Sequence, residues 1–176
     1  MKGFFSELRL YICNHLINKV PSHTIRLWYY RKIMKFIIGE HSSILLGCSF
    51  DAAKGLYIGD NTVINNGCRL DTRGGIKIGN NVSISADTII LTADHDMDNN
   101  FKGRNKGVSI EDYVWTGTRS MVLPGVTLKK GVVIAAGAIV TKDVEENSVV
   151  GGLPAKLIRT RKPSFNYTLN YRRFLQ

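Results

Sequence analysis

One histidine stands where a regular part of this sequence gives way to a polar segment. His95 is flanked by Asp94 and Asp96, and the residues that follow are rich in Gly, Asn and charge. Imidazole changes its charge near neutral pH, so a histidine can remove a hydroxyl proton and turn the oxygen into a nucleophile. A lone loop histidine is more often a solvated side chain. If His95 is catalytic, Asp94 or Asp96 could orient its ring, although either could equally be a turn residue.

The element that must position His95 is a six-residue repeat. The first positions of successive hexads are aliphatic or β-branched, and they are Ile110, Thr116, Val122, Leu128, Ile134 and Val140. The fifth positions are small or β-branched, and they are Val114, Ser120, Val126, Val132 and Ala138. The same phase appears upstream at Ile58, Ile64 and Leu70 and, after a two-residue slip, at Ile78, Ile84 and Ile90. A helix repeats about every 3.6 residues and a strand every two, so a period of six predicts a parallel β-helix.

With these hexads the chain resembles the hexapeptide-repeat acyltransferase superfamily over roughly residues 43–159. The resemblance implies an all-β fold, a left-handed parallel β-helix, which is an exception to the usual right-handed crossover. It also implies a homotrimer with active sites between subunits, acetyl-CoA as the donor, and no metal. Family members place a catalytic histidine at the start of the same loop, after a strand like IILTA, which corresponds to His95. The chain looks most like O-acetyltransferases of sugars and surface polysaccharides, so the expected acceptor is a sugar hydroxyl.

The repeat and its interruptions predict the organisation of the chain. Ile90 and Ile110 are 20 positions apart, which is not a multiple of six, and the segment is too polar to fill a narrow core. It must therefore leave the coil as a loop. The expected parts are a helical N-terminal cap at 1–42, a β-helix domain at 43–159 with an extruded loop at 93–107, and a basic C-terminal extension at 160–176.

The N-terminal part has the apolar spacing of two helices, at residues 3–20 and 24–36, separated by Pro21. The end of a coil needs a cover, which favours a cap over the alternative of a peripheral membrane contact. Basic charge is concentrated at the two ends, because residues 1–40 carry a net +5 and residues 156–176 a net +6, out of +10 for the chain. The CoA nucleotide or an anionic membrane surface fits this charge better than nucleic acid, for which no motif is present.

The residue assigned to the acceptor by the resemblance is Asn65, together with Asp94 and Asp96 near the loop. Asn66 is adjacent, so the assignment could be displaced by one residue. An asparagine at a coil corner can instead serve the turn itself, because it tolerates left-handed backbone. The choice of acceptor should depend on residues 97–106, which no periodicity constrains.

The donor site is expected on two grounds. Small residues would keep a groove open for the thin pantetheine arm of CoA, and they are Gly117, Thr118, Ala135, Ala136 and Gly137. The segments VWTGT, AAGAIVTKD and GGLPAKLIR resemble those that line the CoA channel in the family. By that match the residues in contact with CoA are Trp115, Thr118, Ala136, Thr141, Lys142, Lys156 and Arg159. Lys142, Lys156 and Arg159 would supply cations for its phosphates.

Alternative enzyme classes and a non-catalytic role make different demands on the sequence. A γ-type carbonic anhydrase needs three zinc-binding histidines, whereas the coil region offers His95 and, at its edge, His41. A serine acetyltransferase is expected to carry a larger helical N-terminal domain. A non-catalytic scaffold would not explain the presence of His95 at the start of the loop. A xenobiotic acetyltransferase shares the loop histidine and the closing segment and stays open. Three cysteines without a CxxC pair, and no convincing signal peptide or membrane span, predict a cytoplasmic protein, with its inner membrane face as an option.

Overall fold

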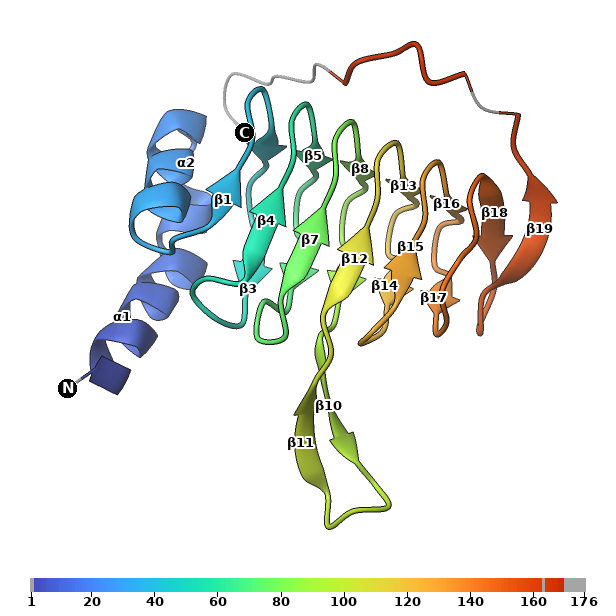
Figure 1. Cartoon of the computed structure of the whole chain (residues 1–176). Coiled ribbons are helices and arrows are strands. Elements are labelled where there is room, and N and C mark those ends of the chain that lie inside the picture. The colour runs from blue at the N-terminus through green and yellow to red at the C-terminus, as the bar shows by residue number, and fades with distance from the viewer. Residues whose placement is uncertain (1, 163, 170–176) are drawn as a thin grey trace.

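A computed structural model describes residues 2–162 and 164–169. Residue 163 and residues 170–176 of the expected C-terminal extension lie outside the described residues. Three parallel sheets form the sides of a coil, with helices at its N-terminal end and a hairpin projecting from one edge (Figure 1). The fold class predicted from the hexads, an all-β parallel β-helix, is confirmed. In Figure 1, β4, β7 and β12 face the viewer and lead upward to turns that cross to the back, so the coil is left-handed.

The three faces of the coil follow one another along the chain. Face A contains β1 (Ile37–Ile38), β4 (Leu56–Ile58), β7 (Ile76–Ile78), β12 (Val108–Ile110) and β15 (Thr127–Leu128). Face B contains β2 (Ser43–Ile44), β5 (Val63–Ile64), β8 (Ser83–Ile84), β13 (Trp115–Thr116), β16 (Val133–Ile134), β18 (Ser148–Gly151) and the antiparallel β19 (Lys156–Thr160). Face C contains β3 (Ser49–Phe50), β6 (Arg69–Leu70), β9 (Ile89–Ile90), β14 (Met121–Val122) and β17 (Ile139–Val140).

The register of the strands explains why the apolar residues recur every six positions. Ile110 pairs with Leu128 and Thr116 with Ile134, so one turn of the coil is three hexads in this part. Every first position of these hexads is buried, which stacks one residue from each face into a narrow core. Upstream, Ile58 pairs with Ile78, a longer turn that accommodates the slip seen in the sequence.

The coil begins earlier than expected. Ile38 in β1 pairs with Ile58, although residues 37 and 38 fall in the range assigned to the helical cap. The Asp60 carboxylate accepts a 2.7 Å hydrogen bond from the Glu40 backbone N–H. One turn later, the Asn80 side-chain oxygen accepts a 2.7 Å hydrogen bond from the Asp60 backbone N–H in the same way. The sequence carried a signal for this turn, because Ile38-Gly39-Glu40 repeats the pattern at Ile58 and at Ile78.

The N-terminal helices are shorter than their apolar spacing predicted. They are α1 (Lys2–His15), the 3-10 turn η1 (Ile17–Lys19) and α2 (His23–Lys32). They lie at the open end of the coil (Figure 1), where Tyr30 packs edge-on against Phe50 with ring centroids 5.3 Å apart. Among the residues that the structure describes, no helix has the length and apolar character needed to cross a bilayer.

The buried Arg26 of α2 ties this cap to the coil. Its guanidinium donates hydrogen bonds to the carbonyls of Val20 and Ile44, at 2.5 and 3.2 Å. Ile44 is the first core residue of face B, so the bond joins helix and coil directly. Burial lowers the pKa of Arg26, although an arginine stays charged at physiological pH.

Replacing Arg26 by alanine should lower the free energy of unfolding by about 1.5–3 kcal/mol, because two buried carbonyls lose a charged donor. Chemical denaturation followed by circular dichroism measures the change. Lys32→Ala, an exposed cation on the same helix, is the matched control and should be close to neutral. Equal stability of the two variants would show that Arg26 does not anchor the cap.

Candidate active site

The interruption of the repeat is an ordered hairpin rather than an irregular loop. Strands β10 (Ala93–Asp96) and β11 (Lys102–Asn105) pair antiparallel, with His95 opposite Gly103. The hairpin leaves the coil at the corner between faces C and A and projects away from it (Figure 1). Successive side chains on a strand point to opposite sides, so Asp94 and Asp96 share one side and His95 lies on the other.

Both carboxylates beside His95 are engaged by one arginine across the hairpin. Arg104 donates to Asp94 from Nε at 2.8 Å and from Nη2 at 3.0 Å, and its Nη1 lies 3.3 Å from Asp96. The hydrogen bonds from Arg104 hold the pKa of the Asp94 carboxyl below its usual value. Within the described chain, the partner of the His95 ring is therefore not Asp94 or Asp96, the two candidates taken from the sequence.

The imidazole of His95 is held by Phe101. Its Nδ1 lies 3.0 Å from the Phe101 carbonyl oxygen, and the two rings stack 4.4 Å apart at 8°. A carbonyl can only accept, so Nδ1 carries the proton and Nε2 keeps its lone pair as the basic nitrogen. Phe101 has a φ of 54°, which is rare for a bulky residue and belongs to the turn that brings its carbonyl to His95. Sequence reasoning missed Phe101, although an aromatic residue within a polar loop was a usable signal.

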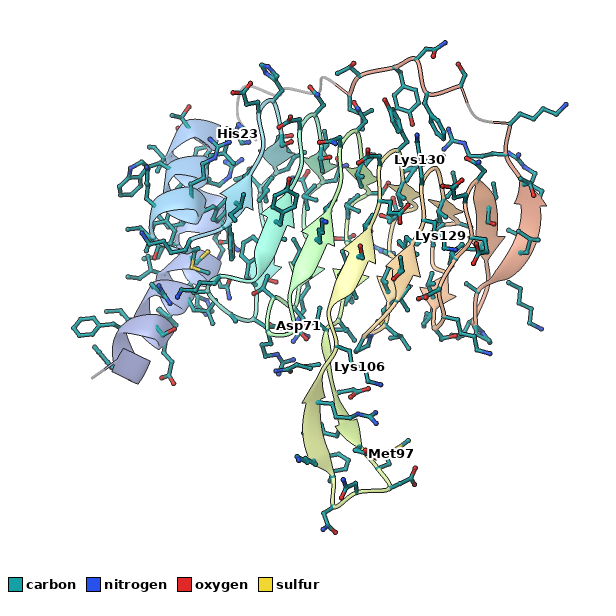
Figure 2. All side chains as sticks on the ribbon, viewed as in Figure 1. His23, Asp71, Met97, Lys106, Lys129 and Lys130 are labelled. Atoms are coloured by element: carbon teal, nitrogen blue, oxygen red, sulfur yellow. The ribbon has the colours of Figure 1, made fainter. Side chains whose placement is uncertain are left out.

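A buried carboxylate fixes the point where the hairpin leaves the coil. Asp71 is fully buried, accepts 2.8 and 3.0 Å bonds from Arg73, and accepts a 3.0 Å bond from the backbone N–H of Thr92. Burial opposes its ionisation, but the bonds from Arg73 and Thr92 outweigh burial, so the pKa of Asp71 lies below its ordinary value. Figure 2 shows Asp71 and Lys106 at the base of the hairpin. Asp71 thus positions the hairpin through Thr92, a role that the hexad pattern did not reveal.

The expected acceptor residue Asn65 lies at the corner between faces B and C. Its side-chain amide donates a 2.9 Å hydrogen bond to the Ile84 carbonyl of the next turn. Neither Asn65 nor Asn66 has the left-handed backbone that an asparagine at a corner can adopt. The amide nitrogen of Asn65 is therefore used by the coil, which leaves its carbonyl oxygen as the atom available to a ligand.

Face B carries an open groove of about 790 Å³. Six of the nine residues expected to bind the donor line it, and they are Trp115, Gly117, Thr118, Ala135, Ala136 and Arg159. Trp115 is half exposed and donates a 3.1 Å hydrogen bond to Ser85, which also lines the groove. Gly117 is required by close approach, because a Cβ there would collide with the backbone nitrogen of Ala136 on the neighbouring turn. The groove is therefore lined by small residues at the corner between faces B and C.

The remaining expected donor residues lie elsewhere. Thr141 and Lys142 follow β17 at the corner between faces C and A, which is the corner from which the hairpin departs. Lys156 lies in β19 at the edge of face B and is exposed, but it does not line the groove. The sequence segments that resemble a CoA channel therefore contain residues from two separate parts of the coil, face B and the corner between faces C and A.

The coil separates the histidine from the groove. In a three-sided coil, face B lies opposite the corner between faces C and A. His95 projects from that corner on the hairpin, whereas the groove is on face B. Figure 2 shows the same separation, with Met97 at the end of the hairpin and Lys130 on the opposite side of the coil beside the C-terminal segment. A single chain therefore does not bring His95 to its own groove.

Across residues 2–162 and 164–169, no three His, Cys, Asp or Glu side chains are grouped so that they could hold a metal ion. The three cysteines, Cys13, Cys48 and Cys68, are buried and form no disulfide bond.

Comparison with known proteins identifies relatives of this coil. Residues 107–142 match the bacterial transferase hexapeptide family, described as six repeats. A hexapeptide-repeat acetyltransferase of Vibrio cholerae, solved with acetyl-CoA, superposes with a TM-score of 0.83 at 29% identity over 92% of this chain and 89% of that one. A galactoside acetyltransferase solved with coenzyme A gives 0.78 at 27% identity over 88% and 78%.

A curated galactoside O-acetyltransferase of Lactococcus lactis is 40% identical over 82 residues, which are 44% of this chain and 40% of that protein. The chain spans less than half the length of such curated relatives. The matched repeats and the superposed coils agree with the architecture described above. The chain shares a left-handed parallel β-helix with the hexapeptide-repeat acetyltransferases and carries their repeat at residues 107–142.

Proposed function

We propose that this protein is an acetyl-CoA-dependent O-acetyltransferase that modifies a sugar hydroxyl. The observation that carries the proposal is the groove on face B, because it collects Trp115, Thr118, Ala136 and Arg159, residues expected to contact CoA. Its small residues leave room for the thin pantetheine arm, and its arginines suit phosphates. The two superposed relatives, solved with acetyl-CoA and with coenzyme A, support this choice of donor.

The proposed reaction is direct transfer. Nε2 of His95 removes the proton of the acceptor hydroxyl, and the oxygen attacks the thioester carbonyl of acetyl-CoA. When the C–S bond breaks, the thiolate of CoA leaves and takes up the proton from the imidazolium. The products are the acetyl ester and CoA with a free thiol. The Phe101 carbonyl stabilises the imidazolium through Nδ1–H, and Asn65 contributes its carbonyl oxygen to the acceptor site.

Because one chain separates His95 from its groove, the active site should form between neighbouring subunits of a homotrimer. The corner that carries the hairpin, Thr141 and Lys142 in one subunit would then face the groove of the next subunit. Closed three-fold symmetry would repeat the same contact between each subunit and the next, and so the same site three times. Light scattering should give about three times the chain mass of 19.6 kDa. An active monomer would contradict this arrangement.

The acceptor class follows from the relatives and the N-terminal surface. The galactoside acetyltransferases among the relatives favour a sugar, and assembly of surface polysaccharides would present one to a cytoplasmic enzyme. Phe4, Phe5, Tyr11 and Trp28 are exposed on the basic helices α1 and α2, which suits contact with the anionic inner face of a membrane. Binding to anionic but not neutral vesicles checks that contact.

The release of the CoA thiol, followed across a panel of sugars, amino acids and antibiotics, tests the reaction. Release that depends on a sugar supports the proposal, whereas release that depends only on an antibiotic identifies a xenobiotic acetyltransferase. If no compound stimulated thiol release and the protein did not bind acetyl-CoA, the proposed activity would be wrong.

Replacement of Arg159 by alanine should raise the KM for acetyl-CoA about tenfold and leave the acceptor KM nearly unchanged, because one phosphate contact is lost. Arg159→Lys keeps the charge but not the paired geometry and should be intermediate. Initial rates with each substrate varied in turn measure both constants. If acetyl-CoA kinetics were indifferent to changes at Lys142, Lys156 and Arg159, the donor would bind elsewhere.

A further inference from the structure

The C-terminal segment crosses the coil and reaches the groove. We call residues 161–162 and 164–169 the strap. The Leu169 backbone N–H donates a 3.1 Å hydrogen bond to the Asn81 side chain, and that of Arg161 donates one of 2.8 Å to the Asn147 carbonyl. Figure 1 shows this segment running back along the coil beyond β19. The strap is therefore bonded to the coil at both of its described ends.

Phe165 anchors the middle of the strap. Its ring stacks on Tyr113 with centroids 4.6 Å apart, and the cations of Lys130 and Arg161 lie 5.1 and 5.5 Å from its centre. Gly131 makes room for it, because a Cβ at that position would lie 2.6 Å from the Phe165 ring. Aromatic and cation–π contacts of this kind hold an exposed segment in one place.

The anchored strap forms part of the groove itself. Tyr167 and Leu169 line it, as do Arg161 at the start of the strap and Arg159 just before it. Tyr167 is oriented by an edge-to-face contact with Tyr113 at 5.4 Å and 85°. This end of the groove thus combines an aromatic ring with two guanidinium groups, whereas the other end is lined by Gly117, Ala135 and Ala136.

We infer that the strap builds a subsite for the nucleotide half of CoA, with Tyr167 as the positioning residue for the adenine. An aromatic ring offers a stacking surface to any base, and guanidinium groups pair with phosphates. The pantetheine half would follow the small residues toward the other end of face B. This inference rests on the proposed donor and adds a part of the site that neither the hexads nor the donor segments contain.

Calorimetric titration with CoA and with pantetheine, which lacks the nucleotide, tests the inference. Tyr167→Ala should weaken CoA binding about tenfold, which is about 1.4 kcal/mol, and change pantetheine binding less than about twofold. Phe165→Ala should act in the same direction by releasing the strap. Tyr167→Phe keeps the ring and should bind CoA like the unaltered protein, as should Tyr11→Ala on the distant helix α1.

These measurements distinguish the proposed nucleotide subsite from the proposed use of CoA as the donor. Unaltered affinity of Tyr167→Ala for CoA would overturn the nucleotide subsite while leaving the donor proposal intact. Equal losses toward CoA and pantetheine would also overturn it, because they indicate a general structural role for the strap. If the unaltered protein itself did not bind CoA, the proposed donor would be wrong, and the inference would be wrong with it.

Discussion

Replacement of His95 by alanine is expected to lower kcat by about 10²–10⁴, the usual share of general acid–base catalysis. The variant should still assemble and bind acetyl-CoA, because the hairpin projects from the coil and contributes little to its core. The acid limb of the kcat profile should vanish with the imidazole, since a protonated ring cannot act as the base. Initial rates across the pH range, with CoA binding measured in parallel, check both statements.

Three substitutions serve as controls for this result. Asp94→Asn and Asp96→Asn should change kcat far less than His95→Ala, because both carboxylates bond Arg104 while Phe101 holds the ring. His41→Ala removes a histidine at the edge of the coil and should be close to neutral. A His95→Ala protein that turns over its acceptor at the original rate would end the proposed mechanism.

Replacement of Ala136 by tryptophan should lower kcat/KM for acetyl-CoA by about 10²-fold or more, since misplacing a substrate by even one ångström can cost this much. Ala136 is exposed and lines the groove, so an indole there would occupy the path proposed for pantetheine. The effect should appear as lost CoA binding in calorimetry while the fold is kept. Ala136→Ser, which leaves the groove open, is the matched control, and equal losses in both variants would contradict the blocked path.

The sequence was sufficient for the coil because its information is local and repeated. Each hexad places one apolar residue, such as Ile110 or Val122, into the same narrow core, so periodicity alone predicts the stack. The first turn begins at Ile37, directly after the helix predicted at 24–36, so it was assigned to the cap. The hairpin has no such period, and its pairing depends on contacts between Asp94 and Arg104 that spacing does not specify.

The site was harder to predict for a geometric reason. Sequence segments resembling a CoA channel include Ala136 and Lys142, only six residues apart, yet a coil with a corner every six residues places them on different sides. The ring contact of His95 is made by the backbone of Phe101, which no side-chain pattern reveals. The strap reaches Tyr113 and Asn81 over a long sequence distance, so its alternating aromatics gave no indication of where it would lie.

In the proposed trimer, His95 of one subunit acts on the donor bound in the groove of its neighbour. Co-expression of His95→Ala with Ala136→Trp, each carrying a different tag, gives mixed trimers after tandem purification. A site that joins the intact hairpin of one chain to the intact groove of the other should restore activity to about a third of the normal level, because each mixed trimer contains one such interface out of three. Mixed trimers with no more activity than either parent would contradict a site shared between subunits.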